Sequence, residues 1–416
     1  MALWTVHGDG RPAPGADVDA GERVSWPLTV GLGVQHLAAM FAATIMVPAL
    51  TGLPPTTTLL FSGVGTLLFL LLTRNRVPAY LGSSFAFVAP LTAARSEGVP
   101  AQLGGVLFAG LLLVVVGIGV KALGVRLLES VMPPVVSGAV IMLVGLGIVP
   151  FAATGVGRQP LFAAVTLAVT ALCAVLGRGL LARIGVLLGI FAGWLVAAMF
   201  DQLDHNAVLA LHQAAWFGMP TLQEPQLRPP VMMLVVPAVL VLVAQNVAHV
   251  KAIGVLTRRD LNGNIGDVLI ADGVATTLAG AGGGSALTTF GANVGVMTVT
   301  KVFSTAAYVV AALGAVVLAF SPKFTALINT VPAGVVGGAS LVLFGTVAMI
   351  GVRTWLENDV DLTDPINLLI GGAAVAAAVS NVTVTFGSLQ FTGIVWGSLL
   401  IVLGHPLLRR LRATGD

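Results

Sequence analysis

The chain has 416 residues, of which 57% are hydrophobic and only 9% are charged, and its mean hydropathy is +0.99. A soluble domain carries about 25% charged residues, so water cannot be the solvent for most of this surface. The net charge of +3 does not indicate nucleic-acid binding, because the basic residues are scattered over loops. Cys173 is the single cysteine, which excludes a disulfide framework.

Fourteen apolar stretches follow a polar segment, residues 1–25, which we expect to be a cytoplasmic N-terminal tail. Most approach the roughly 20 residues that a membrane-spanning helix needs, so we predict an all-α polytopic membrane protein with 14 transmembrane segments. The stretches lie near 27–47, 56–73, 80–94, 101–120, 131–152, 160–177, 182–200, 229–250, 265–281, 285–299, 303–320, 330–351, 365–382 and 388–407.

The basic residues indicate the orientation of these segments. If the N-terminus is inside, 16 of the 20 Lys and Arg residues fall on inner segments. The outer segments hold only Arg95, Arg158, Arg228 and Lys323. Positive charge is enriched on cytoplasmic loops, so we expect both termini to be cytoplasmic.

The sequence repeats itself at an offset near 200 residues. "QHLA" (35–38) aligns with "QNVA" (245–248), "SSFA" (83–86) with "TTFG" (288–291), and "VVSGAVIMLVG" (135–145) with "VVGGASLVLFG" (335–345). Three matches in one order favour a duplication. Seven segments are an odd number, so the second copy enters the membrane from the opposite side, as in the inverted repeats of secondary transporters.

Two stretches, 80–94 and 285–299, are too short to cross a membrane as ordinary helices. "YLGSSFAFVAP" and "GSALTTFGANVG" combine β-favouring residues with Gly, Pro or Asn. We predict for each an extended half followed by a short helix, because exposed backbone is tolerated at this depth only where it is buried in protein or lines a cavity. The alternative is two short helices packed through small residues.

Polar residues gather around these two segments. Asp272 is the only carboxylate well inside an apolar stretch, and "VAQNVAH" (243–249) and "TTFGANVGV" (288–296) lie near it in the chain. Such a cluster is costly in hydrocarbon and predicts a substrate site for a small, neutral, hydrogen-bonding solute. Metal-ligand spacings, a nucleophile with its base and a Walker loop are all missing, so we expect neither an enzyme nor a cofactor or metal.

Four segments resemble the nucleobase/ascorbate transporter family, also called the second nucleobase–cation symporters, and most of all its bacterial uracil and pyrimidine permeases. They are "QHLAAMFAATIMVP" (35–48), "PAYLGSSFAF" (78–87), "NVGVMTVTKVFST" (293–305) and "VPAGVVGGASLVLFG" (331–345). The run from Asn293 to Lys301 matches the signature of that family.

The resemblance implies fourteen spans in two inverted sevens, a core domain of spans 1–4 and 8–11, a gate domain of spans 5–7 and 12–14, and a homodimer. We therefore assign 26–127 and 229–322 to the core domain, 128–228 and 323–408 to the gate domain, and 409–416 to a C-terminal tail. It also implies that substrate binds at the positions occupied here by Phe85, His249, Phe290, Gly291 and Phe344. Phe290 and Phe344 stand where the uracil permease has tyrosines.

Two positions depart from the family pattern. Gln245 and Ala292 stand where the family has a carboxylate, or a glutamine at the second position. A glutamine offers an acceptor and donors, so Gln245 can hold an N–H and C=O edge of a base without carrying a titratable proton. It lies four residues before His249, on one helix face. The alternative is an amide bonded to an adjacent helix.

The neighbouring residues have open roles. Backbone N–H groups from Phe290 to Asn293 can donate to a ring carbonyl, and Phe85 and Phe290 can sandwich the ring. His249 is a ligand, a proton carrier or a packing residue at the membrane surface. Asp272 is the remaining titratable acid, buried or paired with His249, or it braces the second short segment by accepting backbone N–H bonds.

The last group of residues is assigned to support. Asn293 caps the short helix or fixes its backbone, and Thr289 satisfies backbone groups of the extended half. Asn246, which aligns with His36 in the repeat, is assigned to coupling or to structural support.

The sequence thus predicts a secondary transporter of nucleobases, uracil first, that moves its solute by an elevator-type shift in the cytoplasmic membrane. Solute transport is coupled to a proton through His249 or Asp272, to another cation, or to no ion. We favour weakened or absent proton coupling. An anion transporter or exchanger on the same plan and a transport-dead membrane binding protein are the alternatives.

Overall fold

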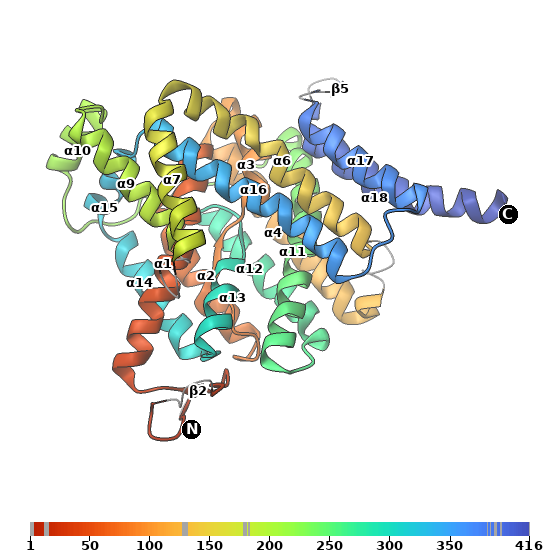
Figure 1. Cartoon of the computed structure of the whole chain (residues 1–416), viewed down its shortest axis with the longest axis horizontal. Coiled ribbons are helices and arrows are strands. Elements are labelled where there is room, and N and C mark those ends of the chain that lie inside the picture. Colours follow the sequence, from red (N-terminus) through yellow and green to blue (C-terminus); the bar gives the residue numbers. More distant parts are fainter. Residues whose placement is uncertain are drawn as a thin grey trace.

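A computed structural model of the chain describes residues 4–11, 16–126, 132–177, 181, 184–380, 382, 384–386, 389–391 and 393–415. Helices dominate it, and its short strands pair two by two. The predicted boundary between residues 127 and 128 lies outside the described residues. Figure 1 shows the helices, with the N-terminus beside β2 and the C-terminus at the free end of α18.

The elements of the first half are β1 (Thr5–Val6), β2 (Glu22–Arg23), α1 (Trp26–Thr51), α2 (Pro55–Leu72), β3 (Leu81–Ser83), η1 (Phe85–Phe87), α3 (Val88–Ala93), η2 (Arg95–Glu97), α4 (Val99–Leu123), α6 (Pro134–Arg158), α7 (Pro160–Leu176), α9 (Gly185–Met199) and α10 (His205–Gln213). Those of the second half are α11 (Pro229–Thr257), η3 (Asn262–Asn264), α12 (Ile265–Gly282), β4 (Leu287–Thr289), α13 (Gly291–Thr300), α14 (Thr305–Ala319), α15 (Pro322–Asn329), α16 (Ala333–Glu357), α17 (Pro365–Val379), β5 (Val384–Phe386), β6 (Leu389–Phe391) and α18 (Gly393–Gly415).

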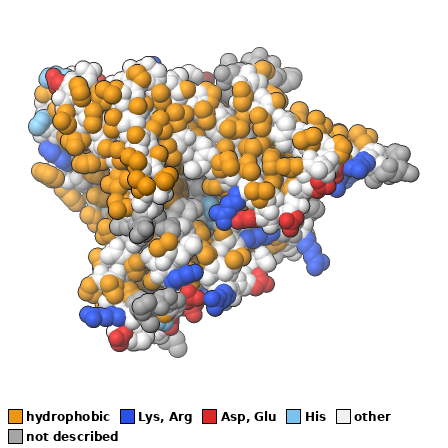
Figure 2. Space-filling view, viewed as in Figure 1, with side chains coloured by type: hydrophobic (Ala, Val, Ile, Leu, Met, Phe, Trp, Pro, Cys, Tyr) orange, Lys and Arg blue, Asp and Glu red, His pale blue; other side chains and the backbone are white. Residues whose placement is uncertain are grey.

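Eight helices of the described chain are long and apolar enough to cross a membrane, or nine if α14 and α15, bent by 84°, form one span. The shorter helices α7, α9 and α17 are also apolar. Hydrophobic side chains cover most of the face in Figure 2, while Lys, Arg, Asp and Glu gather along its lower and right-hand edge. These features describe a multi-pass membrane protein. The count of fourteen segments stays a prediction.

The packing of the helices repeats with exchanged partners. The order long helix, helix, strand with short helix runs from α1 to α3 and again from α11 to α13. The helices α4, α6, α7 and α9 then correspond to α14, α16, α17 and α18, and the short α15 is an additional helix of the second half. Helix α4 packs on α12, and its counterpart α14 packs on α2; α17 packs on α6, and α7 packs on α16. Helices α6 and α16, which are counterparts, pack on each other. Such exchange is what a two-fold relation between the two halves produces.

The two short segments meet at the centre of this arrangement. Strands β3 and β4 pair antiparallel, with Leu81 opposite Thr289 and Ser83 opposite Leu287. Each strand is followed by a short helix, η1 with α3 in the first half and α13 in the second. The prediction of an extended half followed by a short helix is therefore confirmed for both segments.

The sequence did not predict that residues 4–11 and 16–25 would be ordered against the helices. Val18 forms a bridge with Val302, and its backbone N–H donates to the Lys301 carbonyl at 3.0 Å. The Trp4 indole N–H donates to the Thr305 hydroxyl at 2.7 Å. The segment that we predicted as a tail is thus docked on the junction between α13 and α14.

Candidate functional site

The two short helices begin at opposite ends of the antiparallel strand pair, and both pack against α11. The N-cap of α13 is Phe290, no side chain caps this helix, and Gly291 and Ala292 are its first two residues. Across the strand pair, η1 begins at Phe85 directly after β3. Unpaired N–H groups of a first helical turn attract an acceptor. The start of α13 therefore presents backbone donors beside α11.

A chain of four polar side chains connects the second helix start with α12. His249 Nδ1 lies 2.9 Å from Thr289 Oγ1, the Thr289 hydroxyl donates to Asn246 Oδ1 at 2.7 Å, and Asn246 Nδ2 donates to Asp272 Oδ2 at 2.6 Å. Thr289, Asn246 and Asp272 are buried. This chain fixes strand β4 to α11 and α12.

The directions of these bonds determine the tautomer of His249. The single hydroxyl hydrogen of Thr289 is used toward Asn246, so Thr289 can only accept from the imidazole. Nδ1 of His249 therefore carries the hydrogen, and Nε2 is left as an acceptor. A Cβ placed on Gly291 would lie 3.0 Å from Nε2, so this acceptor faces the first residue of α13.

Asp272 is buried, as one of its predicted roles requires, but it makes neither of the two contacts that we predicted for it. Its Oδ2 accepts from the Asn246 side chain, and Oδ1 has no partner among the described residues. It neither pairs with His249 directly nor accepts a backbone N–H bond from β4. Asn246 lies between it and the strand, because an amide has both a donor and an acceptor and can join the two.

Asn293 is not the helix cap that we predicted. It is the third residue of α13, after the N-cap Phe290, and its side chain is buried. Its amide Nδ2 donates to the His36 carbonyl at 3.0 Å and lies 3.1 Å from His36 Nδ1. The His36 ring packs on Tyr308, with ring centroids 4.4 Å apart. Asn293 thus ties α13 to α1, since an amide at this position faces another helix.

The aromatic side chains pair across the two groups of helices. The Phe85 ring meets Phe344 of α16 edge to face, with centroids 5.5 Å apart. Phe290 instead lies over β3, because a Cβ on Gly82 would come within 2.8 Å of its ring. The sandwich of a bound ring between Phe85 and Phe290 stays a prediction.

Gln245 lies one helical turn before His249 on α11 and is partly exposed. Its side chain has no hydrogen-bond partner within the part of the chain that the structure describes, so its amide is free for a solute. Ala292 is exposed at the start of α13 and contributes only its backbone.

Sequence reasoning missed the residues that hold the two strands. The Thr66 hydroxyl accepts from the Leu81 N–H at 2.9 Å, and the Thr276 hydroxyl accepts from the Leu287 N–H at 3.1 Å. Ser62 also donates to the Leu81 carbonyl at 2.6 Å. The signal was present, because "SGVGT" (62–66) aligns with "DGVAT" (272–276) at an offset of 210. This alignment makes Ser62 the repeat-mate of Asp272.

No group of three or more His, Cys, Asp or Glu residues that could hold a metal ion occurs among the residues that the structure describes. The site is therefore built from backbone donors, amides, hydroxyls, one imidazole and aromatic rings.

Comparison with known proteins identifies relatives of this chain in sequence and in fold. Residues 28–387 match the model of a family described as "Permease family". The uracil permease of Bacillus caldolyticus is 39% identical over 398 residues, which cover 91% of each chain, and the uracil permease of Escherichia coli K12 is 34% identical over 407 residues, which cover 95% of this chain and 94% of that one. The transmembrane domain of a cyanobacterial bicarbonate transporter, BicA, shares the fold with a TM-score of 0.58 at 15% identity, covering 91% of this chain and 96% of that one.

Proposed function

The chain belongs to this permease family, the nucleobase/ascorbate transporters, and from that premise we propose that it carries a uracil-like base across the cell membrane. Its relatives are permeases and not enzymes. The observation that carries the proposal is the meeting of free amide, imidazole acceptor and backbone donors at the start of α13.

The proposed pose matches the edge of a pyrimidine. Uracil alternates C=O acceptors with N–H donors on a flat ring. Nε2 of His249 and the amide oxygen of Gln245 accept from ring N–H groups, and the N–H groups of Gly291 and Ala292 donate to a ring carbonyl. Phe85 covers the ring face, and stacking contributes about 1 kcal/mol beyond area burial.

The hydrogen-bond chain supports weak or absent proton coupling. A proton passing between His249 and Asp272 would have to cross the side chain of Asn246, which holds its amide hydrogens in a fixed direction. Carboxamides do not titrate at physiological pH, so Asn246 separates the carboxyl group from the imidazole. On this proposal Asp272 positions Asn246 and takes no part in proton movement.

The proposed architecture has fourteen segments as two inverted sevens. The core domain (26–127 and 229–322) shifts against the gate domain (128–228 and 323–408) in an elevator-type motion, with both termini cytoplasmic. The exchange of packing partners between α4, α12, α2 and α14 supports the two-fold relation. The homodimer and any coupling cation stay predictions.

Uptake of labelled uracil into cells that lack their own permeases tests the proposal. We expect wild-type protein to accumulate or equilibrate uracil and Gln245→Ala to lose at least nine-tenths of the initial rate. Gln213→Ala, an exposed glutamine of α10, is the matched control and keeps the wild-type rate. Good surface expression without uracil uptake by wild type would reject uracil as substrate.

A further inference from the structure

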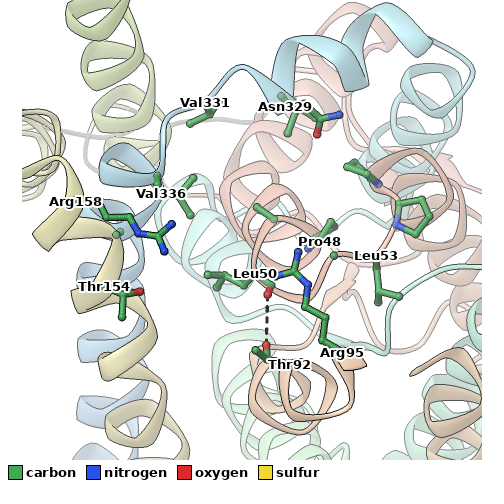
Figure 3. A pocket seen from close by; sticks show the side chains of 18 residues that line it. Pro48, Leu50, Leu53, Thr92, Arg95, Thr154, Arg158, Asn329, Val331 and Val336 are labelled. Atoms are coloured by element: carbon green, nitrogen blue, oxygen red, sulfur yellow. Dashed lines mark hydrogen bonds between the residues drawn. The ribbon is translucent and has the colours of Figure 1, made fainter. Parts of the chain in front are cut away.

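A cavity of 630 Å³ lies where α1 and α6 end and α16 begins. Its walls are largely apolar, with Pro48, Leu50, Leu53, Ile328, Val331 and Val336 among the lining residues (Figure 3). Under the proposed topology this is the outer side of the membrane. We call this cavity the outer vestibule.

The outer vestibule leads toward the candidate site. Leu50 and Val336 of its lining pack in the same apolar cluster as Phe85. Gly337 of the lining is seven residues before Phe344 on α16, or about 10 Å at 1.5 Å per residue. Phe344, which pairs with Phe85, is therefore about two helical turns along α16 from the cavity lining.

Two guanidinium groups from opposite walls face this cavity. Arg95 follows α3, and Arg158 ends α6; Figure 3 shows their side chains approaching the cavity from different elements. Neither forms an ion pair or a hydrogen bond through its side chain within the described part of the chain. None of the 18 lining residues is Asp or Glu.

The acids around the outer vestibule do not line it. Glu97, two residues after Arg95, pairs with Arg228 at 3.1 Å. Asp201 and Asp204 line a separate hollow of 470 Å³ that shares Asn329, Val331 and Ala333 with the vestibule, and Asp204 caps α10 by accepting from the Ala207 N–H. Positive charge in the outer vestibule is therefore not neutralised by its own lining.

Glycines build both positively charged walls. Gly52 has a φ of +82°, and a Cβ there would lie 3.3 Å from Arg95 Nε, so the guanidinium rests on a position that only glycine leaves open. On the other wall, a Cβ on Gly337 would lie 2.7 Å from the Val156 N, so α6 and α16 are in backbone contact two residues before Arg158.

We propose that the outer vestibule is an oxyanion-binding site in which Arg95 and Arg158 hold one carboxylate or phosphate group between them. Guanidinium groups bind such oxyanions with paired charge-assisted hydrogen bonds, and apolar walls focus the field of the two charges. This site is distinct from the proposed uracil site, although its place on the transport path rests on the proposed function.

A bound oxyanion would affect transport by connecting the two domains that move against each other. Arg95 belongs to the proposed core domain and Arg158 to the proposed gate domain, so an oxyanion that binds both joins the two domains. The oxyanion is either inorganic or the acid group of an incoming pyrimidine carboxylate, and both have the same recognition chemistry.

Thermal unfolding of the purified full-length protein at constant ionic strength tests the site without requiring transport. The probes are inorganic phosphate and orotate, a pyrimidine carboxylate, with uracil as the uncharged comparison. We expect at least one anion to raise the Tm of wild type in a saturable way. Arg95→Gln and Arg158→Gln weaken its apparent affinity about tenfold, while Arg95→Lys retains more of it than Arg95→Gln.

Arg228→Gln is the matched control, because Arg228 is a basic residue of the same end that is paired with Glu97 and does not line the cavity. A response to phosphate identifies an inorganic oxyanion, and a response to orotate alone identifies the acid group of a pyrimidine. No shift with either anion, or the same affinity in both Gln variants as in wild type, would overturn the proposal. A failure of uracil uptake leaves this binding result unaffected.

Discussion

Thr66 and Thr276 hold the two crossing strands in the same way from equivalent positions of the repeat. Each hydroxyl accepts from the backbone N–H of the first residue of its strand, Leu81 at 2.9 Å and Leu287 at 3.1 Å. Both threonines are buried. A strand of three residues has too few ladder bonds to satisfy its own backbone, so a hydroxyl from the neighbouring helix supplies the missing partner.

Replacing Thr276 by Val removes this partner at nearly constant volume. The buried Leu287 N–H is then left unpaired, which costs about 1–3 kcal/mol. We expect Thr276→Val to lower the Tm in detergent and to reduce uracil uptake, and Thr66→Val to do the same. Thr277→Val is the control, because the Thr277 hydroxyl bonds only to Gly273 of its own helix. Equal Tm values for Thr276→Val and Thr277→Val would contradict the role of the strand contact.

Asp272→Asn separates a positioning role from a proton-carrying role. The asparagine oxygen can still accept from Asn246 Nδ2, so we expect uptake within about threefold of wild type and no new dependence on a protonophore. Asp272→Leu leaves the buried Asn246 amide without its acceptor, at a cost of about 1–3 kcal/mol, and should impair uptake severely. Protonophore-sensitive accumulation by wild type that Asp272→Asn abolishes would show that the carboxyl group carries the proton.

His249→Ala tests the acceptor at Nε2. Loss of one hydrogen-bond partner to a bound base costs about 1–3 kcal/mol, so the KM for uracil should rise about tenfold or more. His212→Ala, on the exposed face of α10, leaves the KM unchanged. Uptake kinetics decide the case, since an unchanged KM with a reduced maximal rate would assign His249 to movement and not to binding.

The docked N-terminal segment should depend on pH. His7 Nδ1 lies 2.7 Å from Glu22 Oε2, and this hydrogen bond lowers the pKa of Glu22 below its ordinary 4.5. A lowered pKa in the docked form means that Glu22 stabilises docking above about pH 4.5 and that this contribution is lost as the pH falls through the lowered pKa.

Hydrogen exchange of residues 16–24, corrected for the intrinsic pH dependence of exchange, measures this. Protection in wild type should fall as the pH is lowered through that range, and Glu22→Gln should show lower protection that no longer changes with pH. A pH profile of Glu22→Gln that follows wild type would assign the effect to another group.

The sequence determined the class of protein and its central irregularity. Composition excluded water as the main solvent, and the length of the apolar stretches predicted membrane-crossing helices, because a bilayer accepts few charges and no unpaired backbone. The two interrupted segments were predicted from Thr, Phe, Gly and Pro in stretches too short to span. The family was recognised from runs such as Asn293 to Lys301, and the comparison confirmed it.

Only the tertiary structure decided which polar groups meet. Asn246 stands between Asp272 and Thr289, and Asn293 reaches His36 across 257 positions of the chain. Arg95 and Arg158 face one cavity from different helices. Such contacts depend on how the two halves of the chain pack on each other, and no local sequence pattern predicts this packing. Hydrophobic periodicity specifies which residues avoid water, whereas the partners of buried polar groups are fixed by long-range packing.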